Sequence, residues 1–204
     1  MPTPQTADQR LSWTTEHLAG NRLSYRMVST WRVRGTLEEV VAILRCPDGY
    51  SRWWPSVFLS TSILQRGDNN EVGTRVAVVT KGWLPYTLHF AFEVRQSDPR
   101  DGVEVVARGD FNGVGRIRGV ETAEGLEMTM DWQCEVQRPL LRVLARLAHR
   151  LGVSNHRWTM RQGCRSLQAE LDRRRAGASE ARGVPGPVFP HDRFTQRVLG
   201  LPRG

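Results

Sequence analysis

The chain has 204 residues, of which 39% are hydrophobic and 25% are charged, and its formal net charge is +8. This length favours one domain with extensions, and no stretch approaches the roughly 18 apolar residues that a membrane-spanning helix needs. The first ten residues are polar and lack the apolar segment of a secretory signal. The three cysteines lack zinc-binding spacing. We therefore expect a cytoplasmic protein with free thiols, no metal and no cofactor.

Residues 1–20 are predicted to be an N-terminal extension that contains one short helix near 11–18. The next segment, 21–33, alternates apolar and polar side chains. A period of two is typical of a strand with one buried face. The folded domain is therefore expected to begin at residue 21.

Two short helices are expected to follow this strand. Thr36 and Glu39 form a capping box, in which the Thr side chain accepts the amide of Glu39 while the Glu carboxylate reaches back, so a helix begins at Leu37. A second helical turn is expected over 50–54. Pro55 then releases the chain into the first of several further strands.

The middle of the chain reads as about six consecutive strands joined by turns. The clearest covers 126–136, where every second residue is apolar. Asn112 and Gly113 are predicted at the tip of a hairpin between strands over 103–111 and 114–121, because Asn-Gly suits a two-residue turn. An antiparallel sheet built from these strands has one face that must be covered.

One long helix is predicted over 140–175, because Pro139 suits a helix start and apolar residues then recur every three or four positions. Residues 176–204 are interpreted as a Pro/Gly-rich linker followed by a short amphipathic segment. Residues 21–175 then make one α+β domain, in which a curved antiparallel sheet wraps around the C-terminal helix.

Four local motifs accompany this order of elements. They are Trp53-Trp54-Pro55-Ser56-Val57, Lys81-Gly82-Trp83-Leu84-Pro85-Tyr86, Gly109-Asp110-Phe111 and Asn155-His156-Arg157-Trp158. Together, order and motifs resemble the helix-grip fold of the SRPBCC (START-like) superfamily, and in particular its bacterial polyketide cyclase/dehydrase-like branch. The resemblance covers about residues 21–172 and implies a cavity between sheet and helix, where members bind sterols, phospholipids, quinones, polyketides or plant hormones. It supplies no catalytic motif.

Large aromatic side chains are numerous on the faces expected to point inward. Any one of them can be an ordinary core residue, but the set suits the lining of an apolar cavity. The two tryptophans before Pro55 are predicted to lie in a loop and to act as a gate. The predicted lining residues are Trp31, Trp53, Trp54, Phe58, Trp83, Tyr86, Phe90, Phe92, Phe111, Met130, Trp132, His156 and Met160.

His156 is the main candidate for chemistry, because it falls on the apolar face of the long helix. It is either a satisfied core histidine or a donor, acceptor or acid–base group that faces the cavity. Asp131 and Glu135 lie on the polar face of their strand and are expected to point away. Lys81 is expected to face solvent. No residue is assigned a catalytic role.

Arginines form a stripe along the predicted helix, at Arg138, Arg142, Arg146 and Arg150, and the stripe continues on a nearby face at Arg157, Arg161 and Arg165. The stripe is either a solvated helix face or a surface for transient contact with anionic lipid headgroups. Residues 173–204 carry +5 of the net charge, so the folded part is only mildly basic. No nucleic-acid partner is expected, because no reading motif accompanies the stripe.

Three functions remain open at this point. The leading hypothesis is non-enzymatic binding or carriage of a hydrophobic small molecule, such as a lipid, quinone or polyketide-like compound. The second is a polyketide cyclase or dehydratase, which requires an inward-facing ionisable pair. The third is a membrane or partner interaction module that uses the arginine stripe. The almost entirely apolar inward set favours the first.

Overall fold

The computed structural model describes residues 9–16, 24–98, 102–137 and 149–177. A short 3-10 turn, Pro47–Gly49, joins the first two helices. The helices are α1 (Leu37–Leu44), α2 (Tyr50–Trp53) and α4 (His149–Arg175), and the strands are β1 (Gln9–Glu16), β2 (Ser24–Val33), β3 (Phe58–Gln65), β4 (Arg75–Lys81), β5 (Thr87–Asp98), β6 (Gly102–Gly109), β7 (Phe111–Thr122) and β8 (Gly125–Val136).

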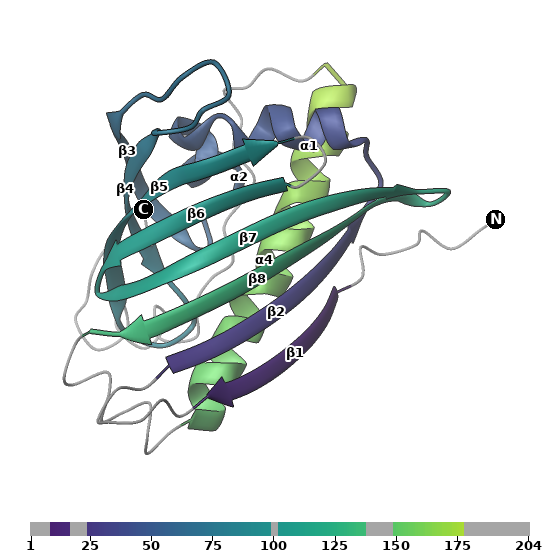
Figure 1. Cartoon of the computed structure of the whole chain (residues 1–204). Helices are drawn as coiled ribbons and strands as arrows, with labels where there is room; N and C mark the ends of the chain where they lie inside the picture. The colour runs from purple at the N-terminus through teal and green to yellow at the C-terminus, as the bar shows by residue number, and fades with distance from the viewer. Residues whose placement is uncertain (1–8, 17–23, 99–101, 138–148, 178–204) are drawn as a thin grey trace, which may run out of the picture.

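The strands form one eight-stranded antiparallel sheet in the order β1-β2-β8-β7-β6-β5-β4-β3. The sheet curves around α4, which crosses its inner face (Figure 1). Helices α1 and α2 lie at the end of the sheet where α4 finishes, and both contact α4 (Figure 1). The predicted α+β helix-grip architecture is confirmed. None of the helices in the described ranges is long and apolar enough to cross a membrane.

The pairing of β2 with β8 brings the two ends of the domain together and aligns their apolar faces. Met27 lies opposite Trp132, Ser29 opposite Met130, and Trp31 opposite Met128. Directly opposed residues share one face of a sheet, so the period-two patterns of both strands point to the same side. That side faces α4, because α4 packs against β2 and its Met160 belongs to the same buried cluster as Trp31.

The predicted N-terminal helix near 11–18 is wrong. Residues Gln9–Glu16 form β1, which pairs antiparallel with β2 from Gln9 opposite Trp31 to Glu16 opposite Ser24. An edge of β2 is available for pairing, and the Trp- and Thr-containing segment has the side chains that strands prefer. The folded domain therefore includes part of the predicted extension.

The predicted hairpin tip is also wrong. Asn112 and Gly113 lie inside β7, where they pair with Glu135 and Cys134 of β8. The turn centres on Asp110, whose carboxylate accepts the His89 amide at 2.8 Å and whose own amide donates to the His89 carbonyl at 2.9 Å. The preceding glycine takes a φ of +147°, which a residue without Cβ tolerates. Asp110 therefore caps this turn.

The C-terminal half of α4 is fixed to the start of the domain. Gln168 accepts the Arg34 amide at 2.7 Å and donates to the Arg34 carbonyl at 3.4 Å. Arg175 donates to the Glu39 carboxylate at 2.8 and 2.5 Å. Glu39 also completes the predicted capping box with Thr36. The predicted helix start over 140–148 and the tail over 178–204 lie outside the described residues.

Candidate ligand-binding site

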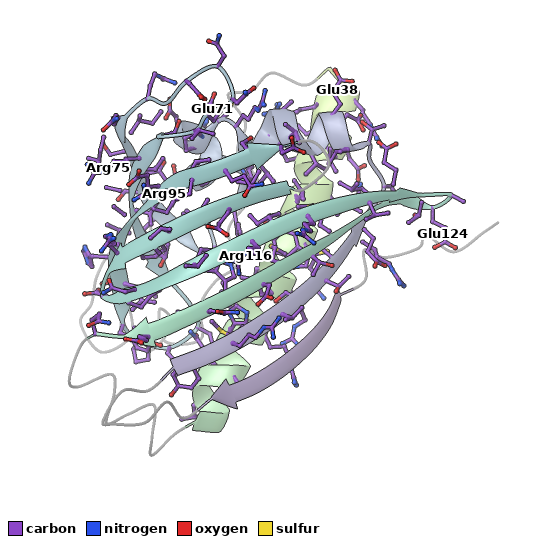
Figure 2. All side chains as sticks on the ribbon, viewed as in Figure 1. Glu38, Glu71, Arg75, Arg95, Arg116 and Glu124 are labelled. Carbon is purple, nitrogen blue, oxygen red and sulfur yellow. The ribbon has the colours of Figure 1, made fainter. Side chains whose placement is uncertain are left out.

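The outer face of the sheet carries ion pairs between neighbouring strands. Arg26 binds Asp131 at 2.7 Å, Arg32 binds Glu127 at 2.7 Å, and Arg116 binds Glu104 at 2.8 Å. Figure 2 shows Arg95 and Arg116 on this outer surface, with α4 on the other side of the sheet. The outward orientation predicted for Asp131 is thus confirmed. Because neighbouring strand residues point to opposite faces, the side chains between these charged groups face α4.

The inner face is closely packed where α4 ends, and we call this region the closed end. Trp31 is 1% exposed, Leu126 1% and Leu167 0%. A Cβ added at Gly163 of α4 would lie 2.4 Å from the Trp31 ring and 2.3 Å from the Trp54 ring. No larger side chain fits there. The closed end consists of Trp31, Val33, Val40, Ile43, Trp53, Trp54, Leu126, Met128, Cys164, Leu167 and Leu171.

The predicted tryptophan gate is wrong, because both tryptophans belong to the closed end. Trp53 lies in α2 and Trp54 is its C-cap, and they are 3% and 8% exposed. The Trp54 ring makes edge contacts with Trp31 at a centroid distance of 5.4 Å and with Phe58 at 5.2 Å. The Trp54 carbonyl also accepts the amides of Val57 and Phe58. The segment is therefore part of the core.

Exposure rises along the inner face toward the start of α4. On the helix, Leu167 is 0% exposed and Met160 is 8% exposed, whereas His156 and Val153 are partly exposed. The same gradient follows β8, where Leu126 and Met130 are buried and Trp132 and Cys134 remain partly exposed. We call this region the open end. It is represented by Met27, Phe90, Phe111, Trp132, Cys134 and His156.

Three aromatic rings of the open end form a continuous wall across the sheet. The ring centroids of Phe90 and Phe111 are 4.5 Å apart, and those of Phe111 and Trp132 are 6.4 Å apart. Gly115 lies opposite Trp132 on β7, and a Cβ there would come within 2.8 Å of the indole ring. The glycine therefore lets the large indole lie along the sheet.

A polar pair lies at the boundary between the two ends. The Ser29 hydroxyl is 3.4 Å from Nε2 of His156, and Ser29 is 1% exposed. Burial lowers the pKa of His156 to about 4, so the imidazole is neutral at neutral pH. Burial also raises the pKa of the Cys134 thiol to about 12 and raises the pKa of Tyr86. These inward groups are uncharged under ordinary conditions.

The loop between β4 and β5 is fixed to α4 next to His156. The Leu84 amide donates to Oδ1 of Asn155 at 3.0 Å. A Cβ at Gly82 would lie 2.1 Å from the same oxygen, so the close approach requires glycine. Two motifs that sequence analysis singled out separately are therefore in direct contact, and this loop carries the predicted Trp83 and Tyr86.

Comparison with solved structures identifies the architecture. A protein from Thermus thermophilus is 18% identical, with a TM-score of 0.56 over 76% of this chain and 99% of its own. The Zhui aromatase/cyclase from Streptomyces sp. R1128 is 13% identical, with a TM-score of 0.55 over 84% and 100%. A START superfamily protein from Mycobacterium smegmatis is 15% identical, with a TM-score of 0.51 over 72% and 97%. The chain has the START-like helix-grip fold. No protein-family model and no curated protein matches it.

Within this helix-grip fold the predicted lining residues fall into three places. Phe90, Phe111, Trp132 and His156 come together at the open end, and Trp83 and Tyr86 lie in the adjoining loop. Phe92 stacks on Tyr50 at a centroid distance of 6.4 Å, away from that wall. The rest are buried in or against the closed end: Trp31, Trp53, Trp54, Phe58, Met130 and Met160.

Sequence reasoning missed Ser29, Asn155 and Cys134 as parts of the site. Ser29 occupies an inward position of β2 between Met27 and Trp31, where its small polar side chain looks like an interruption of the apolar pattern. Its parity alone could have identified it. In the described part of the chain, no group of three or more His, Cys, Asp or Glu side chains is arranged to hold a metal ion.

Proposed function

We propose that the protein binds a hydrophobic small molecule between the open end of the sheet and α4. The observation that carries the proposal is the residual exposure of side chains that face inward. Phe90, Phe111 and Trp132 lie on the concave face, yet each is only partly buried. A close-packed interior leaves few gaps larger than a water molecule, as the closed end of the same sheet illustrates. The uncovered area is best explained by an internal space.

The electrostatic environment of the open end supports this proposal. His156 and Cys134 keep some exposed area, but burial shifts both pKa values toward the neutral forms. The area that they expose therefore adjoins a space enclosed by protein. A concave, mainly apolar space with a few fixed polar groups is typical of small-molecule sites.

We propose a binding role for His156 and the Ser29 hydroxyl beside it. One structure that shares the fold is named an aromatase/cyclase, and a catalytic role in this chain would need an inward-facing ionisable pair. The structure places Ser29, a neutral hydroxyl, beside His156. A hydroxyl beside a neutral imidazole can orient a ligand, and so we propose recognition as the role of this pair.

The class of ligand proposed is a lipid, quinone or polyketide-like molecule, and its transfer can involve a membrane surface. Arg157, Arg161 and Arg165 of α4 are exposed. Basic side chains near an anionic bilayer contribute about 1 kcal/mol each. Transient contact with anionic lipid is thus proposed for the helix face that carries them.

Titration with the neutral apolar fluorophore N-phenyl-1-naphthylamine tests the proposed function. Wild-type protein should bind the probe with a rise in fluorescence, and Phe90→Ala and Trp132→Ala should each weaken binding about tenfold, since each removes a large apolar contact. Val120→Ala is the matched control, because Val120 is 65% exposed. Absence of binding to the wild type, or unchanged affinity in both variants, would show that the proposal is wrong.

A further inference from the structure

One row of directly opposed residues crosses the inner face of the sheet and includes Trp132 of the open end. Met27 of β2 pairs with Trp132 of β8, which pairs with Gly115 of β7. The row continues to Val105 of β6 and Val94 of β5, which are 7% and 9% exposed. Directly opposed residues share one face of a sheet. The largest side chain of the row therefore lies beside a residue that has none.

The indole of Trp132 fills the place that a side chain on Gly115 would take. A Cβ there would lie 2.8 Å from Cη2 and Cζ2 of the indole and 2.9 Å from Cε2. Non-bonded carbon atoms normally stay about 3.5–4.0 Å apart. The φ angle of Gly115 lies outside the left-handed region, so the backbone conformation does not require glycine there. The requirement is steric, and the nearest atoms all belong to Trp132.

We infer that Gly115 sets the size of ligand that the open end accepts, because it lets the Trp132 indole lie along the sheet and out of the space next to α4. An alanine side chain at this position would project from the inner face, since strand residues alternate between faces. The indole would then have to turn away from β7 and into that space. Gly115 is thus a positioning residue that acts through Trp132. The inference rests on the proposed function and adds a limit on ligand size.

A second glycine of β7 supplies a matched comparison. Gly119 has the same inward parity as Gly115, and a Cβ there would lie 2.9 Å from Cδ1 of Leu37 and 3.3 Å from Cδ1 of Leu126. Leu126 belongs to the closed end, and Leu37 packs against it. An alanine at Gly119 therefore crowds the packed core, whereas an alanine at Gly115 crowds the wall of rings. Only the substitution at Gly115 should change which ligands bind.

Fluorescence titration with two neutral amines of different size tests the inference. N-phenyl-1-naphthylamine carries a phenyl ring that 1-naphthylamine lacks. In Gly115→Ala the affinity for the larger amine should fall about tenfold, as expected when a methyl group is forced into a fitted site, while the affinity for the smaller amine falls less than about twofold. Gly119→Ala should leave both affinities within about twofold of the wild type.

A substitution of Trp132 assigns the effect to the contact. Phenylalanine has one ring where tryptophan has two, so it lacks the outer ring that a Cβ at Gly115 would meet. Trp132→Phe should weaken N-phenyl-1-naphthylamine about threefold, and the double variant Gly115→Ala/Trp132→Phe should be no weaker, whereas independent effects would multiply to about thirtyfold. The double variant lacks the clash, so it keeps the test decisive if Gly115→Ala alone does not fold.

The outcomes separate this inference from the proposed function. If the wild type does not bind N-phenyl-1-naphthylamine, the proposed function is wrong and the inference falls with it. If the wild type binds it but Gly115→Ala weakens both amines equally or leaves the larger one unaffected, binding stands and the inference is overturned. Single losses that multiply in the double variant would overturn it as well.

Discussion

The closed and open ends of this molecule use the same strands and the same helix, but they differ in how completely the inner face is covered. On β8, Leu126 is 1% exposed and Met130 is 6% exposed, whereas Trp132, two residues further along, remains partly exposed. The alternation of side chains does not change between the two ends. How far an inward side chain is buried depends instead on the element that lies opposite it. At the closed end these elements are α1, α2 and the end of α4, and at the open end it is the start of α4.

If the proposed function holds, one secondary-structure framework supplies both a stable core and a binding space. The closed end has large interlocking rings and a glycine of α4 where no larger side chain fits. The open end has a ring wall and a neutral polar pair. Packing at the first supplies stability, and the second is where we propose that a ligand binds.

The largest effect expected is on stability at the closed end. Trp31→Ala should lower the free energy of unfolding by about 3–5 kcal/mol, because it removes a buried indole and leaves a cavity. Trp132→Ala should cost less than half as much, since that ring is already partly uncovered. Urea unfolding followed by far-ultraviolet circular dichroism measures both. Equal losses would show that the two ends are packed alike.

The second effect comes from the acid titration of His156. Its pKa is about 4 in the folded protein and 6.5 when unperturbed, so the unfolded chain takes up the proton first as the pH falls. Its contribution to stability is fully present above pH 6.5 and is lost as the pH falls toward 4. The loss amounts to up to about 3 kcal/mol at about 1.4 kcal/mol per pKa unit.

Unfolding free energies measured across this pH range, for wild type and His156→Gln, check the prediction. The difference between the two proteins should change in favour of the variant as the medium becomes more acidic. A difference that does not vary with pH would mean that His156 is solvated, and the open end would then be continuous with bulk water.

The smallest effect concerns the link between α4 and α1 at the closed end. Hydrogen bonds from Arg175, with a further bond from the Thr36 amide, lower the pKa of Glu39 to about 2. Glu39→Gln should reduce stability by about 1 kcal/mol or less, because the pair is partly exposed to solvent. The wild-type advantage should be present above pH 4.5 and disappear as the pH falls toward 2.

Glu38→Gln provides the matched control for this measurement, because Glu38 lies in the same helical turn and is exposed. Thermal unfolding should shift less for this variant than for Glu39→Gln. Identical shifts would mean that the first turn of α1 responds to charge alone and not to the contact with Arg175.

Much of the fold could be predicted from local patterns, because a period of two in β5 and β8 and a capping box at Thr36 each have one physical interpretation. Asn112-Gly113 was misleading because pairing of β7 with β8 outweighed the local turn preference. The site was harder to predict. The alternation of apolar residues placed Phe90 and Trp132 on the inner face. No local sequence pattern shows whether the opposing helix covers them. Trp53 and Trp54 looked available in sequence and proved to be buried.

A crystal structure of the protein with bound N-phenyl-1-naphthylamine tests the central claim most directly. The account predicts density for the probe between the start of α4 and the rings of Phe111 and Trp132, with its far end near Ser29 and His156. Side chains that fill this region, or a probe bound only on the outer surface of the sheet, would contradict the account.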